Sequence, residues 1–208
     1  MRTHKNIYPD IISFRNLLKA SKLAQKGKRF KNSTALFNFQ LERELWKLYD
    51  ELTSKCYKPG AYNHFTIFEP KQRMISAAQY RDRVVHHAIH NILEPIFEPT
   101  FIFDSYATRK GKGTHAAIDQ FQKFAKRNCY VLKCDIQKYF PSINREILMK
   151  LIKKKIACKD TLWLVQKVLD SHQIMARELQ PASQPASQPA SQPASQPASQ
   201  QLAYLLAI

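Results

Sequence analysis

The stretch YVLKCDIQKYFPSI, Tyr130–Ile143, places a single acidic residue, Asp135, inside an otherwise apolar and aromatic run. Successive side chains alternate between two faces, with Val131 and Asp135 on the same face, and this alternation predicts a buried β-strand over 130–136. A buried carboxylate without a partner is costly. Asp135 is therefore expected to lie on an exposed edge, to pair with a base, or to hold a metal ion.

The residues that follow Asp135 favour a metal site without deciding it. A strand that ends in an aspartate and passes through a tight turn with two aromatic residues into a helix can hold a divalent cation. Mg²⁺ binds carboxylate and backbone carbonyl oxygens, keeps several waters and takes substrate phosphates as further ligands. The alternative is that Asp135 pairs with Lys133 or Lys138, or caps the turn.

The charge balance of the whole chain indicates a polyanionic partner. Its 33 Lys and Arg outnumber 16 Asp and Glu, for a net charge of +17, and no charged residue occurs after Glu178. Nucleic acid is the first expectation, because lysine and arginine neutralise phosphates. An acidic membrane surface and a basic surface without a partner are the alternatives. No run approaches the roughly 18 apolar residues of a membrane span.

The cysteines and the N-terminus predict a cytoplasmic protein. Cysteine spacing matches neither a C-x-x-C pair nor a zinc site, which indicates reduced, mostly buried thiols. The first ten residues, MRTHKNIYPD, lack the apolar run of a secretory signal.

Apolar periodicity predicts a largely helical chain. The repeat of Leu41, Leu45, Leu48 and Leu52 is the strongest case. The other expected helices are a basic amphipathic helix over 11–30, one over 81–97 that Pro95 closes, one from an N-cap at Thr114 to about Arg127, one that starts at Pro141 and Ser142, and one over 160–171.

A β-hairpin is expected between two of these helices, with strands around Phe65–Phe68 and Met74–Ala77 and a turn at 70–72. The turn would carry Lys71 and Arg73 to the hairpin tip. Two cations at alternate positions could clamp a triphosphate. The alternative is a solvated turn.

A second basic segment is the loop SYATRKGKGTH, 105–115. Its glycines permit close approach to a nucleic-acid backbone, and Arg109, Lys110 and Lys112 could neutralise phosphates. The alternative is a flexible basic turn, and the spacing is not that of a P-loop. His86, His87 and His90 have no acidic partner at matching spacing, so packing or nucleic-acid contact is favoured over a metal site.

The C-terminal part differs in kind, because Pro-Ala-Ser-Gln repeats five times over 181–200. Proline at every fourth position excludes a helix interior and predicts a disordered or polyproline-II-like spacer. Three regions are therefore expected: N-terminal helices over 1–60, a central region over 61–178, and the repeat tail over 179–208.

Three segments in a fixed order resemble a known family. FTIFEPKQRMISAAQYRDRVVHHAI, FEPTFIFDSYATRKGKGTHAAI and YVLKCDIQKYFPSINREIL are similar to the fingers and upper palm of prokaryotic reverse transcriptases, most closely those of diversity-generating retroelements, which are related to the group II intron and retron enzymes. The resemblance covers roughly 36–169. It implies an α+β right-hand polymerase fold with fingers, an incomplete palm and N-terminal helices. It also implies nucleotidyl transfer, in which a primer 3′-hydroxyl attacks the α-phosphate between two Mg²⁺ ions.

The resemblance also implies roles for individual residues. Asp135 would bind both metals, and the carbonyl of Ile136 would assist. Phe140, beside Tyr139, would stack under the nucleotide sugar. The triphosphate would bind Lys71 and Arg73, and the template region would contact Arg81, Arg83, Arg109, Lys110 and Lys112. The implied partners are an RNA template, a DNA primer, deoxynucleoside triphosphates and an accessory retroelement protein.

The chain departs from the family pattern after Asp135. The family's second carboxylate motif, Tyr-x-Asp-Asp or close to it, does not occur, and neither does the Gly-rich segment that precedes it. The later acidic residues, none of them paired as Asp-Asp, are Glu146, Asp160, Asp170 and Glu178. We therefore expect a truncated family member that is inactive alone and prone to aggregate at an unpaired palm edge. A non-catalytic nucleic-acid-binding remnant and a partner-binding subunit are the alternatives.

Overall fold

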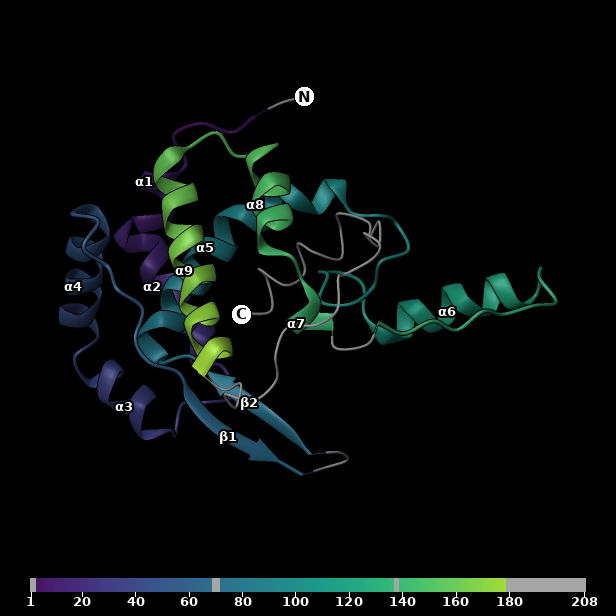
Figure 1. The fold of residues 1–208 in the computed structure, drawn as a ribbon, viewed down its shortest axis with the longest axis horizontal. Coiled ribbons are helices and arrows are strands. Elements are labelled where there is room, and N and C mark those ends of the chain that lie inside the picture. The colour runs from purple at the N-terminus through teal and green to yellow at the C-terminus, as the bar shows by residue number, and fades with distance from the viewer. Residues whose placement is uncertain (1–2, 69–71, 137–138, 179–208) are drawn as a thin grey trace.

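The computed structural model describes residues 3–68, 72–136 and 139–178 and shows a mixed α+β chain that is mostly helical. Figure 1 shows most of its helices grouped together, with a two-stranded hairpin and one separate helix projecting from the group. In chain order the elements are α1 Tyr8–Ile12, α2 Phe14–Ala24, α3 Asn32–Phe39, α4 Leu41–Thr53, β1 Asn63–Ile67, β2 Arg73–Ala77, α5 Tyr80–Phe97, the 3₁₀ turn η1 Glu98–Thr100, α6 Thr114–Ala125, α7 Tyr139–Ser142, α8 Arg145–Lys153 and α9 Lys159–Glu178.

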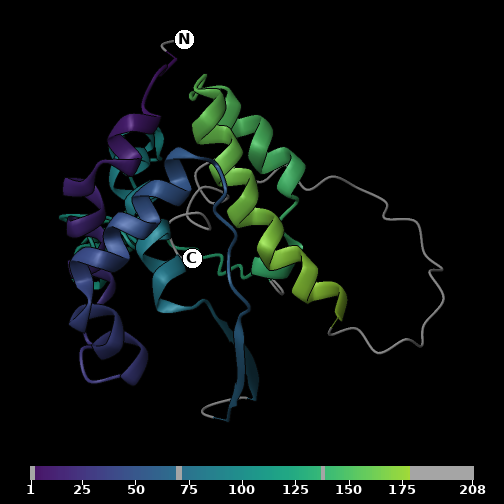
Figure 2. The same cartoon turned by 90° about the vertical axis from the view of Figure 1, so that its left-hand side faces the viewer.

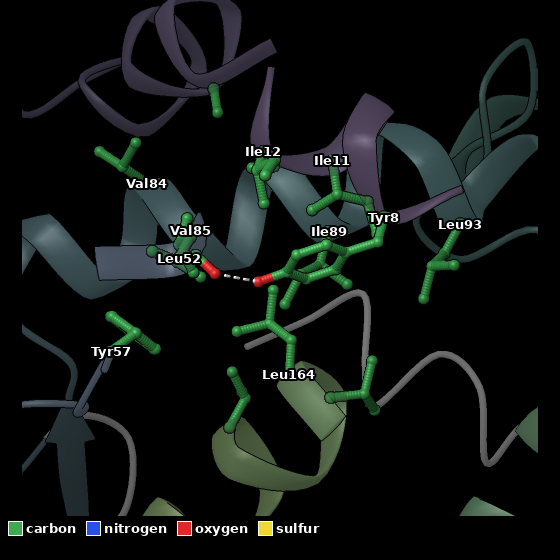
Figure 3. Packing of buried hydrophobic residues seen from close by; sticks show 14 of the residues in the cluster. Tyr8, Ile11, Ile12, Leu52, Tyr57, Val84, Val85, Ile89, Leu93 and Leu164 are labelled. Atoms are coloured by element: carbon green, nitrogen blue, oxygen red, sulfur yellow. Dashed lines mark hydrogen bonds between the residues drawn. The ribbon is translucent and has the colours of Figure 1, made fainter. Parts of the chain in front are cut away.

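One hydrophobic core joins the N-terminal helices to α5 and to the last two helices. Figure 3 shows Tyr8 and Ile11 of α1, Leu52 of α4, Ile89 of α5 and Leu164 of α9 packed together. Helices α8 and α9 lie side by side (Figure 2), and α9 also contacts α1. The N-terminal segment contacts the connection between α8 and α9, because the His4 amide donates to the Lys155 carbonyl and the His4 carbonyl accepts from the Ala157 amide.

The leucine repeat forms the expected helix. Leu45, Leu48 and Leu52 of α4 are all 0% exposed, and Leu41 packs against the same core. Because residues three and four apart share one face of a helix, the repeat places its whole apolar face inward.

The predicted helix over 11–30 is two helices instead. The chain leaves helical geometry at Ser13, whose side chain accepts a hydrogen bond from the Asn16 amide and caps α2. This cap redirects the chain, because an N-cap residue itself has non-helical dihedral angles. After α2, the polar stretch over 26–34 includes the start of α3 at Asn32.

Two helix boundaries, one near a proline and one near a glycine, differ slightly from expectation. Pro95 lies inside α5, which runs on to Phe97, so the prediction that it closes the helix was wrong. Gly113 rather than Thr114 is the N-cap of α6, with a φ of 123° that favours glycine. Helix α6 ends at Ala125, close to the expected Arg127.

The hairpin is confirmed. Strands β1 and β2 pair antiparallel, with Phe65 opposite Ile75 and Ile67 opposite Arg73. Each strand begins within two residues of the prediction. The expected turn at 70–72 lies largely outside the described residues.

The predicted buried strand over 130–136 does not form. The segment is assigned no strand, and Tyr130 and Leu132 are 94% and 87% exposed. A strand needs a neighbour for its backbone hydrogen bonds and a cover for its apolar face. The described part of the chain provides neither, so the alternation alone does not produce a strand.

The last two helices are close to expectation. Leu148 and Ile152 of α8 are 0% exposed, whereas the neighbouring Ile147 is 42% exposed. Helix α9 runs seven residues beyond the expected Ser171, to Glu178.

The expectation that the cysteines are mostly buried was wrong. Cys56, Cys129 and Cys134 are exposed, Cys158 is buried, and all four are free thiols. Among the described helices, none is both long and apolar enough to cross a membrane.

Candidate nucleotide and nucleic-acid interface

Asp135 lies on an extended, exposed segment that leads into α7. Its Oδ1 accepts a hydrogen bond from the Ile136 amide, at 3.0 Å from the nitrogen. Within 3–68, 72–136 and 139–178, no group of three or more His, Cys, Asp or Glu side chains could hold a metal ion. The Asp135 carboxylate is exposed to solvent. It therefore needs neither a metal ion nor a base to offset a cost of burial.

The aromatic pair after Asp135 begins α7. Tyr139 is the first residue of that helix and packs against the hydrophobic core, and burial raises the pKa of its hydroxyl. Ile136 is half-buried. The backbone of Phe140 is helical, but its side chain lies outside what the structure describes.

The hairpin residues expected to bind the triphosphate are placed only in part. Arg73 begins β2, opposite Ile67 and two residues before Ile75. Its side chain is not among the described ones, and Lys71 lies outside the described residues altogether. Every residue of β1 is exposed, so a ligand can reach this strand of the hairpin.

Arg81 and Arg83, neighbours on the first turn of α5, have different surroundings. Arg81 forms an ion pair with Glu51 of α4, and its guanidinium lies over the ring of Tyr57, 5.4 Å from the centroid. The guanidinium of Arg83 lies 5.4 Å from the centroid of the Tyr80 ring, and burial lowers its pKa. Arg81 therefore fastens α4 to α5, whereas Arg83 has no acidic partner in the described part of the chain.

The basic loop folds back on itself through its own cations. Arg109 donates to Glu98 at 2.8 Å and to the carbonyls of Ile102 and Ser105, so its main role in the loop is structural. Lys110 pairs with Glu94 at 2.7 Å yet its side chain is 83% exposed. Its charge remains available to solvent.

Lys112 closes the same loop from its other end. Its ammonium lies 4.2 Å from the ring centroid of Phe103 and 4.9 Å from that of Tyr106, and it donates to the Phe103 carbonyl. Two rings around one cation stabilise the loop without neutralising its charge.

The three histidines of α5 lie in dissimilar environments. His86 is 6% exposed, and His90 lies 3.7 Å from Glu94. Burial lowers the pKa of His87 and of His90, so both imidazoles are neutral at pH 7.

A comparison with protein families matches a region that contains the candidate residues described above. Residues 58–191 match the family model for reverse transcriptase (RNA-dependent DNA polymerase). The chain belongs to the reverse transcriptase family. The match begins before the hairpin and includes α5, the basic loop and Asp135.

Individual relatives of this reverse transcriptase chain are distant. Protein YkfC of Escherichia coli strain K12 is 29% identical over 145 residues, 65% of this chain and 37% of that protein. The group II intron-encoded protein LtrA of Lactococcus lactis is 25% identical over 131 residues, 62% of this chain and 22% of that protein. The nuclear intron maturase 1 of Arabidopsis thaliana is 27% identical over 90 residues, 43% and 13% respectively. The chain thus spans less than half the length of these relatives.

Sequence reasoning about this reverse transcriptase chain missed Asp82, a buried carboxylate in the first turn of α5. It is 2% exposed, and it accepts hydrogen bonds from the Tyr57 hydroxyl and the Gly60 amide, each at 2.8 Å. Burial, followed by the charge of Asp82, raises the pKa of Tyr57. The network fixes the chain where it enters the hairpin, and an acidic residue in the first turn of an apolar helix was the available sign.

Proposed function

We propose that this chain is the fingers and upper palm of an RNA-directed DNA polymerase, with an RNA template, a DNA primer and deoxynucleoside triphosphates as its ligands. The family match over 58–191 carries the proposal, because it takes in the hairpin, the basic loop and Asp135 in one continuous alignment. Residues 61–178 would form the fingers and partial palm, preceded by a helical region over 1–60.

The proposed roles are those that the resemblance to the family implies. Asp135 would supply a carboxylate to the reaction centre, beside the carbonyl of Ile136. The nucleotide would bind Lys71 and Arg73 of the hairpin, and its sugar would lie against Tyr139 and Phe140. The exposed Lys110 and the half-buried Lys112 would contact a phosphate backbone, while Arg109 would hold their loop in shape.

The described residues do not by themselves fit a two-magnesium centre, although enzymes of this family generally use divalent metal ions. Two close divalent cations require several negatively charged ligands to offset their repulsion. Downstream of Asp135, Asp160 is paired with Lys55 at 2.6 Å and Asp170 accepts from Gln166 at 2.7 Å. We therefore propose that the 208 residues bind nucleic acid but do not polymerise, and that further carboxylates must come from elsewhere.

Two measurements on the same folded sample test this proposal. Fluorescence anisotropy should report binding of a labelled RNA–DNA primer–template in EDTA. Primer extension with Mg²⁺ should give no incorporation, from either the wild-type chain or Asp135→Ala. Incorporation that disappears in Asp135→Ala would refute the proposed inactivity, and an absence of salt-dependent binding would refute the nucleic-acid function.

A non-catalytic nucleic-acid-binding protein is the second candidate. The net charge of +17 favours it, since electrostatic binding requires no metal centre. It predicts equal affinity for Asp135→Ala and wild type, and no gain of activity when other palm segments are supplied in trans.

A further inference from the structure

A cleft of about 870 Å³ opens between α3, the first turn of α5 and the base of the hairpin. Its walls include Lys28 and Lys31 from the turn before α3, Arg83 from α5 and Phe65 from β1. Figure 1 shows α3 on the side of the molecule away from α6. The two lysines lie outside the 58–191 match, so the family comparison assigns them no role.

The cleft gathers positive charge that the described residues do not neutralise. Its described lining contains four cations, of which Arg81 is already paired with Glu51, and one acid, Glu44. Burial, then the charges of Arg83 and Lys31, lowers the pKa of Lys28. The buried Nε of Arg83 has no hydrogen-bond partner. Like charges held together and partly desolvated favour an anion between them.

The floor of the cleft is rigid and aromatic. Tyr80, 3% exposed, donates its hydroxyl to the Ser21 carbonyl at 2.9 Å and meets the Phe37 ring edge-on with centroids 5.1 Å apart. On the hairpin wall, Phe65 is 49% exposed. A preorganised basic surface beside an open aromatic ring is the arrangement that binds unpaired bases and their phosphates.

We propose that this cleft binds a single-stranded nucleic acid, with Lys28, Lys31 and Arg83 neutralising its phosphates and Phe65 stacking on a base. The volume exceeds what one inorganic phosphate fills and suits a nucleotide unit. A base pair in a duplex cannot stack on a side chain without opening, so the ligand is an unpaired strand. The inference rests on the proposed nucleic-acid function but needs neither a metal ion nor Asp135.

The test measures how the full chain binds a labelled oligouridine of about 12 nucleotides, by anisotropy in EDTA. Lys28→Gln with Lys31→Gln should weaken binding about tenfold and lower the slope of log Kd against log salt by about 1.4, since each single-strand phosphate contact contributes about 0.7. Arg83→Gln should lower the slope by about a further 0.7. Phe65→Ala should weaken binding about tenfold without changing the slope, because it removes stacking and no charge.

The matched control is Lys153→Gln with Lys154→Gln, an equal loss of charge at two exposed residues where α8 ends. It should change affinity less than about twofold, because distant charges act only through the overall field. Urea unfolding of each variant checks that the fold persists.

Three outcomes would overturn the proposal that the cleft binds a single strand. The first is that its variants match the control pair while wild type still binds RNA, which would leave the proposed function standing. The second is that duplex RNA, or polyphosphate of equal charge, competes as well as the single strand. The third, no salt-dependent binding by wild type, would remove the proposed function as well.

Discussion

Tyr8 joins the first helix to the fourth through one polar contact inside the core. Its ring is 6% exposed, and its hydroxyl donates to the Leu52 carbonyl at 2.6 Å (Figure 3). Burial, followed by the charges of Asp160 and Cys158, raises the pKa of Tyr8 to about 12 from 10.0. The folded chain therefore favours the neutral phenol more strongly than the unfolded chain does.

We expect this difference to appear as a loss of stability at alkaline pH. Because the folded pKa is the raised one, the contribution is complete below pH 10 and disappears as pH rises to about 12. Tyr8→Phe should cost about 1 kcal/mol at pH 8 through the lost hydrogen bond. It should also make the decline in unfolding free energy shallower by up to about 1.4 kcal/mol per pH unit above pH 10.

Urea unfolding from pH 8 to 11 measures both effects. The control is Tyr130→Phe, which removes a hydroxyl from a residue that is 94% exposed and should leave the free energy of unfolding unchanged. Parallel pH profiles for Tyr8→Phe and wild type would show that the Tyr8 hydroxyl is not responsible.

At the scale of elements, the sequence predicted what local periodicity determines. The buried faces of α4 and α5 could be predicted from the spacing of their apolar residues, because a helix forms its backbone hydrogen bonds within its own segment. The break at Ser13 was missed, since a single serine between Ile12 and Phe14, within an apolar helical pattern, gives little sign that it will cap a helix. The strand over 130–136 failed for the opposite reason, because a strand depends on partners that its own residues cannot supply.

For the candidate site too, the sequence predicted which residues take part but not their tertiary partners. Residue type identified the hairpin cations, Asp135 and the basic loop. It could not distinguish Arg81, neutralised by Glu51 from another helix, from Arg83, which has no such partner. Nor could it bring Lys28 and Lys31 to the hairpin base, because that arrangement depends on the tertiary packing of α3.

Helix α6 should be the least stable of the long helices. None of its residues is buried, and Figure 1 shows it extending away from the other helices. An isolated helix of about 12 residues is marginal in water. Hydrogen exchange by mass spectrometry should therefore show α6 amides exchanging about two orders of magnitude faster than those in the buried middle of α5. Equal protection of the two helices would mean that α6 is held by contacts absent from this structure.

The whole molecule divides into a packed group of helices and a poorly covered remainder. The group contains the core, whereas α6 and the segment after it expose Ile118, Phe121, Phe124, Tyr130 and Leu132. Contiguous exposed apolar surface of this kind promotes association. The net charge of +17 opposes it, and salt weakens that opposition.

The expected result is self-association that grows with salt and depends on α6. The triple variant Ile118→Gln, Phe121→Gln, Phe124→Gln should scatter less light than wild type at about 0.5 M salt, where charges are screened beyond a few ångströms. Its free energy of unfolding should change by less than about 0.5 kcal/mol, because Ile118, Phe121 and Phe124 are already 47%, 53% and 45% exposed in the folded chain. Leu148→Gln is the contrasting variant: the side chain is 0% exposed, so its loss should cost several kcal/mol and increase scattering. If the triple variant instead destabilised the chain, the apolar face of α6 would be packed in solution, and the weak protection expected for its amides would fail with it.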